Sequence, residues 1–380
     1  MKRSSADVVV VGGGIAGLSV ARALSARAGL SVCLLEQERL LASHSSGRNA
    51  AIFRPLEPNA TTAALCLRSL ELLAALEHDA KRGLLRRSGL LLVSSEESKI
   101  LDLARHGARV GVGVELLSGS SLFEAAPFLQ GGQAHHAAWV PGGGVLDIDG
   151  LNTALARVAA ARGCRLRTGC KARRIVLDCG RIAGVLLDDG QTLATGQVVL
   201  AAGAWNAVLA GTCGASLPLT PLCRHLVQLS DGGQLASSGT AARATVWRLE
   251  REVYLRPESS GVLASPCDEA PSSAGVPTVK PAALEQLAER LQLLAPRFGR
   301  LSVRSSWACL RTFARDRELV LGPDPRVGGL FWLAGLGGRG MAVGLAAGEI
   351  LAGQIVDGAD HPLAGVVRPA RLLDFHGGTS

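Results

Sequence analysis

The sequence predicts an α/β fold that opens with a strand, a helix and a second, parallel strand. Three observations in residues 6–36 predict it. The four valines at 8–11 form an apolar run typical of a strand buried on both faces. From Ile15 onward, apolar side chains recur on one face of a helix that we expect to end at Gly29. Residues 32–35 form a second apolar run, which predicts the second strand.

The turn between the first strand and the helix has the spacing of a dinucleotide-binding site. Gly12, Gly14 and Gly17 stand as G-x-G-x-x-G, and Glu36 closes the second strand. Gly12 would allow the tight turn, Gly14 the approach of a pyrophosphate, and Gly17 the packing of helix on strand. The helix N-terminus would hold the phosphates, and Glu36 an adenosine ribose. The pattern fits FAD or NAD and argues against a 2′-phosphate; a glycine-rich turn in an ordinary α/β unit is the alternative.

Composition narrows the classes of partner. The chain has 380 residues, a hydrophobic content of 48% and a net charge of +8, so about two domains with a large core are expected. Its basic balance does not predict nucleic-acid binding, because the arginines are scattered singly and only 3% of residues are aromatic. The nine cysteines include no CxxC pair, which favours reduced cytosolic thiols over disulfides or a zinc site. We therefore expect a cytoplasmic protein without a metal.

Neither end of the chain predicts a membrane segment. The apolar run after Lys2 and Arg3 is too short for a signal peptide and is needed as a strand. The apolar stretch at 327–356 is interrupted by Arg339 and Glu349, so it is a poor transmembrane candidate.

The rest of the chain alternates helical and strand patterns. Helices are predicted at 60–82, 95–107, 118–126, at 150–162 with Asp149 as its cap, at 281–294 and from the glycine loop 335–340 to 357. Strands are predicted at 89–93, 135–140, within 164–203 with a hairpin at 188–190, within 217–265, at 301–313 and at 330–334; residues 267–279 are predicted as a loop. Serines and a glycine at 43–51 suggest a second loop that opens onto a helix N-terminus.

Six stretches together resemble the FAD-dependent D-amino acid oxidase/dehydrogenase family, which includes glycine oxidase and sarcosine oxidase. They lie at 8–21, 44–51, 198–205, 253–266, 306–313 and 331–349, in the family's order. Within the family the resemblance is strongest to the D-arginine dehydrogenase branch. It implies an FAD-binding Rossmann-like domain of residues 1–83, 142–217 and 312–380. A substrate domain of residues 84–141 and 218–311 would hold a mostly antiparallel sheet.

The resemblance also implies the residues that bind FAD, which we expect to be held non-covalently because the C-terminal glycine loop has no cysteine. They are Gly12, Gly14, Ile15, Ala16, Gly17, Glu36, Gln37, Ser45, Ser46, Gly47, Arg48, Asn49, Ala50, Ala51, Ala172, Ala201, Ala202, Gly203, Trp205, Gly335, Gly337, Gly338, Arg339, Gly340 and Met341. The N-terminus of the closing helix could stabilise negative charge on the reduced flavin.

On the substrate side, Arg311 matches the arginine that binds the amino-acid carboxylate, a task suited to a bidentate guanidinium. Tyr254, the single tyrosine of the chain, matches the hydroxyl that assists it, and Arg224 matches a third pocket position. Arg339 stands where the relatives have a tyrosine. Three converging arginines would favour a substrate with more than one anionic group, such as a dicarboxylic amino acid.

The family resemblance implies oxidation of the C–N bond of a D-amino acid, glycine or an N-substituted amino acid, with hydride transfer to flavin and hydrolysis of the imine. Oxygen or another acceptor would then take the electrons. His44 is expected to be a loop residue near the cofactor. Glu57 and His225 are candidates to accept an amine proton, but a structural role is the expectation for each, and the reaction does not require a protein base. The alternatives are oxidation of a 2-hydroxy acid, which needs a general base, oxidation of a secondary amine in a biosynthetic pathway, and a flavin-binding protein without catalysis.

Overall fold

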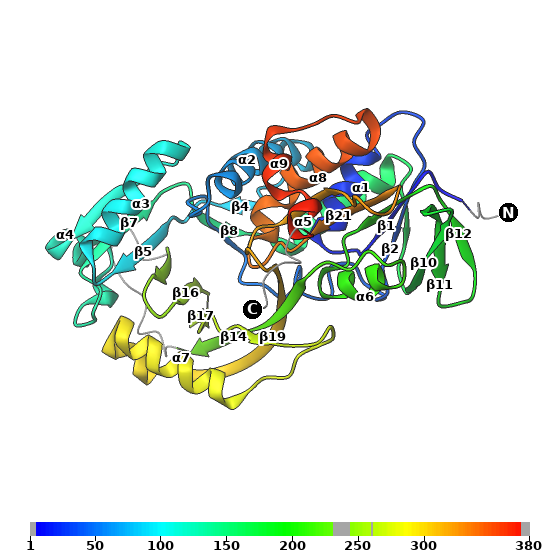
Figure 1. The fold of residues 1–380 in the computed structure, drawn as a ribbon. Coiled ribbons are helices and arrows are strands. Elements are labelled where there is room, and N and C mark those ends of the chain that lie inside the picture. The colour runs from blue at the N-terminus through cyan, green and yellow to red at the C-terminus, as the bar shows by residue number, and fades with distance from the viewer. Residues whose placement is uncertain (1–4, 231–243, 260, 374–380) are drawn as a thin grey trace, which may run out of the picture.

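The computed structural model describes residues 5–230, 244–259 and 261–373. A mixed α/β fold contains two large sheets that lie side by side (Figure 1). The predicted strands at 217–265, the two ends of the FAD-binding domain, and Lys2 and Arg3 fall partly or wholly outside the described residues. The boundaries of the two domains stay a prediction.

The first sheet contains the predicted dinucleotide-binding strands. Its order is β20 (Val320–Pro323), β21 (Leu330–Ala334), β13 (Gln197–Leu200), β1 (Val8–Val11), β2 (Val32–Leu35) and β9 (Arg165–Arg167). All neighbours are parallel except β20 and β21. Val8 and Val10 pack into one apolar cluster and Val9 and Val11 into another, on opposite faces of the sheet. Burial on both faces is the reason why these strands are continuous apolar runs.

Helices cover one face of this sheet, and a smaller sheet covers the other. The helices are α1 (Ile15–Leu24), α2 (Ala60–Ala80), α5 (Ile148–Ala161) and α8 (Gly340–Asp357), and the smaller sheet is β10 (Ala172–Asp178), β11 (Arg181–Leu187) and β12 (Thr192–Ala194). The hairpin predicted at 188–190 joins β11 to β12. In the described part of the chain, α8 alone is long and apolar enough to cross a membrane, but 67% of it is buried, and it packs against α1 and α2.

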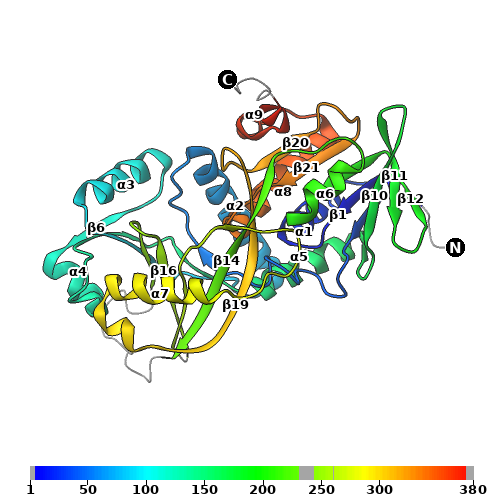
Figure 2. The ribbon, with the colours of Figure 1, turned by 60° about the horizontal axis from the view of Figure 1, so that its bottom comes forward.

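The second large sheet is mostly antiparallel, as predicted. It contains β18 (Ala270–Pro271), β14 (Leu219–Ser230), β17 (Gly261–Ser265), β16 (Val253–Glu258), β15 (Thr245–Arg248), β5 (Leu90–Ser94), β7 (His136–Val140) and β6 (Glu115–Ser118), with β19 (Ser302–Ala314) paired to β14. The β15–β5 pair is parallel. Figure 2 shows the long strands β14 and β19 crossing the molecule together.

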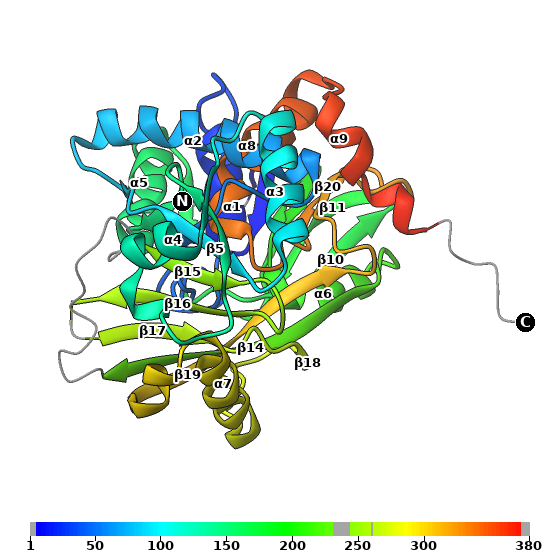
Figure 3. The ribbon, with the colours of Figure 1, turned by 90° about the vertical axis from the view of Figure 1, so that its left-hand side faces the viewer.

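Helix α7 (Pro281–Leu294) covers the outer face of this sheet, and the opposite face is turned toward the helices of the first sheet (Figure 3). Helices α3 (Glu97–Val110) and α4 (Gly119–Ala125) lie at the β6 end, and the short helices α6 (Asn206–Gly211) and α9 (Pro362–Val367) belong to the first sheet's side. A small sheet of β3 (Ile52–Phe53), β8 (Gly144–Leu146) and β4 (Leu85–Arg86) lies between the two halves.

Several boundaries differ from the prediction. Helix α2 ends at Ala80, helix α3 begins and ends two to three residues later than predicted, and the predicted loop 267–279 contains the short strand β18. Helix α1 ends at Leu24, and Gly29 lies in the following turn with a φ of 78°. Helix α5 begins two residues earlier than predicted, so its cap is Asp147, whose Oδ1 accepts a hydrogen bond from the backbone N–H of Gly150 at 2.9 Å. Asp149 lies inside the first turn, where its negative charge interacts favourably with the positive end of the helix dipole, and it does not cap the helix.

Candidate active site

One cavity of about 660 Å³ gathers nearly all of the predicted site residues. The β1–α1 turn, the 43–51 segment, β14, β16, β19 and the turn before α8 line it. Of the residues predicted to bind cofactor or substrate, Gly17 and Gly47 alone do not line the cavity. Its size is in the ordinary range for small-molecule and cofactor sites, roughly 300–1,000 Å³.

The glycine turn is shaped by close contacts. Gly12 has a φ of 112°, and a Cβ there would overlap the carbonyl oxygen of Ala201 on the neighbouring strand. A Cβ on Gly17 would overlap the carbonyl oxygen of Gly12, so Gly17 lies at the contact of helix and strand, as its predicted packing role requires. A Cβ on Gly14 would come within 2.9 Å of Ser46 Oγ. The backbone therefore excludes side chains at Gly12 and Gly17, whereas a side chain at Gly14 would require the Ser46 side chain to move.

Glu36 is buried directly after β2, at the wall of the cavity. Its Oε2 accepts a hydrogen bond from the backbone N–H of Gly13 at 2.6 Å, and its Oε1 accepts one from the N–H of Glu38 at 2.9 Å. These two donors fix the orientation of the carboxylate. An ionised carboxylate has about four acceptor positions, so capacity remains for a hydroxyl group.

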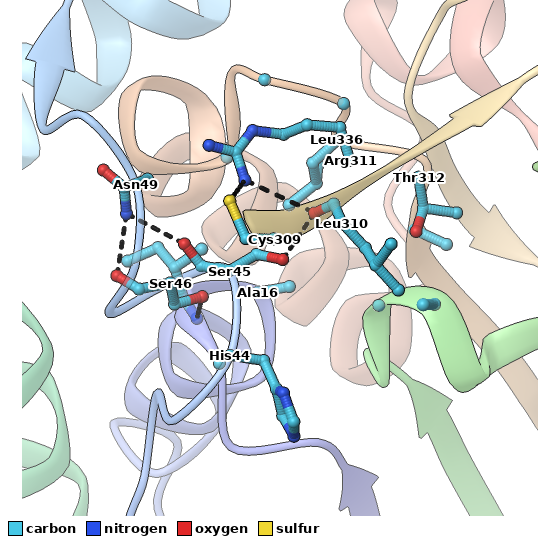
Figure 4. Close-up of a pocket in the computed structure, with 18 of the residues that line it drawn as sticks. Ala16, His44, Ser45, Ser46, Asn49, Cys309, Leu310, Arg311, Thr312 and Leu336 are labelled. Carbon is cyan, nitrogen blue, oxygen red and sulfur yellow. Dashed lines mark hydrogen bonds between the residues drawn. The ribbon is translucent and has the colours of Figure 1, made fainter. Parts of the chain in front are cut away.

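The 43–51 segment joins the two halves of the site (Figure 4). Ser46 Oγ accepts a hydrogen bond from the backbone N–H of Ile15 at 2.9 Å, and Ser45 Oγ donates one to the carbonyl of Leu310 at 2.5 Å. The Asn49 amide donates to the carbonyls of Ser45 and Ser46 and accepts from the N–H of Ala51. The asparagine thus satisfies backbone groups that a helix would otherwise pair.

The prediction that this loop opens onto a helix is therefore wrong. The segment leads into the short strand β3, and the next helix, α2, begins only at Ala60. Gly47 has a role in the turn itself, because a Cβ there would overlap the carbonyl oxygen of Ala42. The segment still lies at the cavity, but it brings side-chain hydroxyls and amides there instead of a helix N-terminus.

The two long strands place the predicted substrate residues on one face. In the β14–β19 register Arg224 pairs with Cys309 and Leu222 with Arg311, so the side chains of these four residues project from the same side of the sheet. Tyr254, on β16, packs with Cys309 in one cluster. Residues about 85 positions apart in the chain thus line one wall of the cavity.

Arg311 is a buried cation without a carboxylate partner among the described residues. It is 6% exposed. Its Nη1 donates to Cys309 Sγ at 3.0 Å and to the carbonyl of Leu310 at 3.4 Å, as Figure 4 shows. Neither acceptor carries a full negative charge. A buried charge is costly unless it is paired, so this guanidinium is suited to an anionic ligand in the cavity.

Tyr254 lies beside this arginine and is fully protonated at neutral pH. It is 3% exposed, and its ring packs against Trp247 at 4.8 Å between centroids. Burial raises the pKa of its hydroxyl to about 12, although the charges of Arg224 and Arg311 act in the opposite direction. The hydroxyl can therefore donate a hydrogen bond to an anion held by Arg311.

Arg224 lines the same cavity, but its charge is already neutralised. Its Nη2 donates to Glu269 Oε1 at 3.0 Å, and its Nε donates to the carbonyl of Asp268 at 3.0 Å. Arg339 is also engaged, because its Nη2 donates to the carbonyl of Arg317 at 2.7 Å. The three arginines line one cavity, and Arg224 and Arg339 already have hydrogen-bond acceptors there; the preference for a substrate with two anionic groups stays a prediction.

Glu57 is a buried carboxyl group in the cavity wall. It is 7% exposed, and its nearest cations are Arg54 at 3.8 Å and Arg339 at 3.9 Å, both beyond hydrogen-bond distance. Burial raises the pKa of this carboxyl group, and the two arginines offset that effect only in part. Glu57 can thus hold a proton at a higher pH than an exposed glutamate.

The two histidines considered from the sequence have structural contacts. His225 is fully buried and does not line the cavity; its Nδ1 bonds Asp268 at 2.7 Å, and its Nε2 accepts from the N–H of Lys280 at 3.0 Å. Both ring nitrogens are engaged, so His225 cannot accept a substrate proton, and the nearby cluster with Cys223 has no ring nitrogen left for a metal. His44 lines the cavity, where it bonds Glu38 and packs against Trp205.

Several cavity residues had no signal in the sequence. Cys309 lies inside a recognised stretch, but its contact with Arg311 depends on strand geometry. Glu269 lies in the predicted loop 267–279 and Arg317 in a stretch for which no element is predicted, and no spacing rule marks either residue. Their positions are decided by the packing of segments distant in the chain.

A family model described as "FAD dependent oxidoreductase" matches residues 7–354, which is most of the chain. The chain belongs to this family. It is therefore an enzyme that uses FAD, as the sequence predicted, and the match includes both large sheets.

Curated relatives of this flavoenzyme are distant. It is 26% identical over 93% of its length to the mouse mitochondrial pyruvate dehydrogenase phosphatase regulatory subunit, and 26% identical over 93% to human mitochondrial sarcosine dehydrogenase. It is 27% identical over 97% to the bifunctional tRNA 5-methylaminomethyl-2-thiouridine biosynthesis protein MnmC of Burkholderia thailandensis. The chain spans only 42%, 40% and 60% of these three proteins, respectively.

Solved structures share the fold over nearly the whole chain. L-proline dehydrogenase of P. horikoshii has a TM-score of 0.87 with 21% identity, and 97% of each chain is covered. Glycine oxidase of Geobacillus kaustophilus has a TM-score of 0.79 with 25% identity, and 94% of this chain and 96% of that chain are covered. The predicted fold class, a Rossmann-like part with a mostly antiparallel second sheet, is confirmed.

The cavity of this flavoenzyme fits FAD. Helices α1 and α8 both begin at the cavity, and neither has an acidic residue in its first turn or a side-chain cap from its own N-cap residue. Their N-termini present partial positive charge to an anionic group. Glu36 and Ala172 line the same cavity as Arg311, so a dinucleotide held by the glycine turn would share one space with a substrate.

Proposed function

We propose that the enzyme oxidises the C–N bond of a small amino acid that carries one free carboxylate: a D-amino acid, glycine or an N-substituted amino acid. The observation that carries this proposal is the buried guanidinium of Arg311, which faces the cavity without a carboxylate partner among the described residues. Sarcosine dehydrogenase and glycine oxidase, two of the proteins to which the chain is similar, are named for small amino acids.

The binding steps follow from the residues of the wall. Arg311 would hold the substrate carboxylate, and the Tyr254 hydroxyl would donate a hydrogen bond to the same group. This contact fixes the substrate's α-carbon and amine within the cavity, and the buried walls exclude water from them. FAD, when bound, supplies the hydride acceptor for the oxidation. The imine product would then hydrolyse in water.

The amine must be in its neutral form when it is oxidised, so its proton has to leave. Of the two candidate acceptors, His225 is bonded at both ring nitrogens, whereas Glu57 lines the cavity with a raised pKa. Glu57 is thus the acceptor that the geometry favours, directly or through water. An enzyme that oxidised 2-hydroxy acids would need a general base for the hydroxyl proton; His44 lines the cavity and has one ring nitrogen bonded to Glu38, so the substrate panel below includes 2-hydroxy acids.

The test is anaerobic reduction of the purified holoenzyme by a substrate panel. The panel contains glycine, D- and L-amino acids, N-methyl amino acids, secondary amines without a carboxylate and 2-hydroxy acids. We expect bleaching of the flavin band by an amino acid with one carboxylate, and readmitted air then distinguishes an oxidase from a dehydrogenase. Bleaching by a 2-hydroxy acid or by an amine without a carboxylate would refute the proposal. Acid precipitation should release the flavin if it is held non-covalently.

A further inference from the structure

A shared carboxylate closes one side of the cavity. Glu269 Oε1 accepts a hydrogen bond from Arg224 Nη2 at 3.0 Å and another from Arg317 Nη2 at 2.6 Å. Arg224 is buried, whereas the side chain of Arg317 is 50% exposed and lies 4.0 Å above the ring of Phe313. All four residues line the cavity. One oxygen atom thus joins an inner arginine to an outer one.

The segment that carries Glu269 is fixed independently of the cavity. The preceding residue, Asp268, accepts hydrogen bonds from the backbone N–H and the ring of His225, at 2.8 and 2.7 Å. His225 in turn accepts from the N–H of Lys280 at the start of α7. Asp268 also accepts from Arg224 through its backbone carbonyl. The backbone next to Glu269 is therefore anchored by the buried His225–Asp268 pair, which holds the partly exposed Glu269 carboxylate close to Arg224.

The pairing of Arg224 with Glu269 limits where a second anion can bind next to Arg311. Glu269 neutralises Arg224, which leaves Arg311 as the arginine on this wall without a carboxylate partner in the described chain. The same carboxylate is shared with Arg317, so these three side chains together carry one net positive charge, and what Glu269 withholds is the guanidinium of Arg224. A ligand with one carboxylate can pair with Arg311, but a second carboxylate that reaches Arg224, on the same face of the strand pair, would have to displace Glu269.

We propose that Glu269 determines the substrate charge of this site: it occupies Arg224, so that the enzyme accepts amino acids with one carboxylate and rejects those with two. This inference rests on the proposed function, in which Arg311 binds the single carboxylate. Glu269 acts through Arg224 and is a specificity-determining residue, not a catalytic one. The class of dicarboxylic substrates, which the three arginines suggested from the sequence, is excluded by a fourth residue.

The test compares two carboxylates that cannot be oxidised, butyrate and glutarate, by titration of the flavin absorbance of the holoenzyme. We expect wild type to bind butyrate more tightly than glutarate. In Glu269→Gln, which keeps the size and one acceptor of the side chain, the ratio of the glutarate Kd to the butyrate Kd should fall by about tenfold or more, because a charge-assisted hydrogen bond contributes that factor. Glu269→Ala should change the ratio in the same direction and serves if the first variant does not retain FAD.

Two further variants make the result specific. Arg317→Gln removes the outer arginine but leaves Glu269 on Arg224, so the ratio should stay within about threefold of wild type. The double variant Glu269→Gln/Arg224→Gln should lose the gain for glutarate. An unchanged ratio in Glu269→Gln and Glu269→Ala, or a gain that persists without Arg224, would overturn the inference. Butyrate binding that does not depend on Arg311 would instead overturn the proposed function, so the two failures are distinguishable.

Discussion

Replacing Arg311 by methionine should change carboxylate binding and protein stability in opposite directions. Methionine keeps most of the volume of the side chain and removes its charge. Arg311 is 6% exposed and, within the part of the chain that the structure describes, bonds a thiol at 3.0 Å and a carbonyl at 3.4 Å. In the protein without substrate it is thus a buried charge with weak compensation. The variant should therefore bind carboxylates poorly and fold more stably.

Both effects have a magnitude. Truncating one partner of a buried, hydrogen-bonded charge pair costs about 2–5 kcal/mol, so the Kd for butyrate should rise roughly 30- to 4,000-fold. Replacing a buried charge by an apolar group of similar volume stabilises proteins by about 1–4 kcal/mol. We expect a gain near the lower limit, which corresponds for a chain of this length to a rise in Tm of roughly 1 °C or more.

Titration of the flavin absorbance with butyrate measures the first effect, and thermal unfolding with FAD in excess measures the second. Arg304→Met is the matched control, because Arg304 lies on the same strand, is exposed and does not line the cavity. A butyrate Kd within about threefold of wild type would refute the assignment of Arg311 as the carboxylate-binding residue. A Tm that falls well below that of the control would show that Arg311 holds the strand pair together instead.

Three other perturbations test the fold and its charges. Gly17→Ala should yield protein without bound flavin, because the added Cβ would overlap a backbone carbonyl. Gly365→Ala, in a helix with open space around it, is the control and should keep its flavin. The flavin absorbance of each protein after gel filtration measures the difference. Glu57→Gln should be more stable than wild type near pH 8, and the difference should vanish toward pH 4. The reason is that the pKa of Glu57 is raised in the folded protein, so its ionisation above the ordinary carboxyl pKa costs stability. Tm measured across this pH range tests it, and a difference that does not change with pH would contradict it. Asp324→Asn should lower the free energy of unfolding by about 3 kcal/mol at pH 7, measured by urea unfolding, because this buried carboxylate bonds an arginine and a tryptophan. These bonds lower its pKa, so wild type loses their contribution as pH falls through that pKa, and the loss in the variant should be smaller at low pH. Asp360→Asn, at an exposed position, is the control, and equal losses in the two variants would contradict the reasoning.

The sequence by itself determined the dinucleotide-binding unit. The apolar strands β1 and β2, the positions of Gly12 and Gly17, and Glu36 after the second strand all lie within about thirty residues. Each depends on a local property: a backbone turn, a missing Cβ, or burial of a strand on both faces. Each of these properties depends on residues close together in the sequence, so it could be predicted without knowledge of the fold. The six resembling stretches then indicated which family's sheet architecture to expect.

The tertiary structure decided the charge of the substrate wall. From the sequence, Arg224, Arg311 and Arg339 are three equal cations, but in the fold Glu269 neutralises the first and a backbone carbonyl engages the third. The conformation of the 43–51 segment also depends on the fold. Asn49 pairs with backbone groups of Ser46 and Ala51, and the segment forms no helix. The physical reason is range: an ion pair requires two groups within about 4 Å, and Arg224 and Glu269 meet only because the β17–α7 segment folds back onto β14.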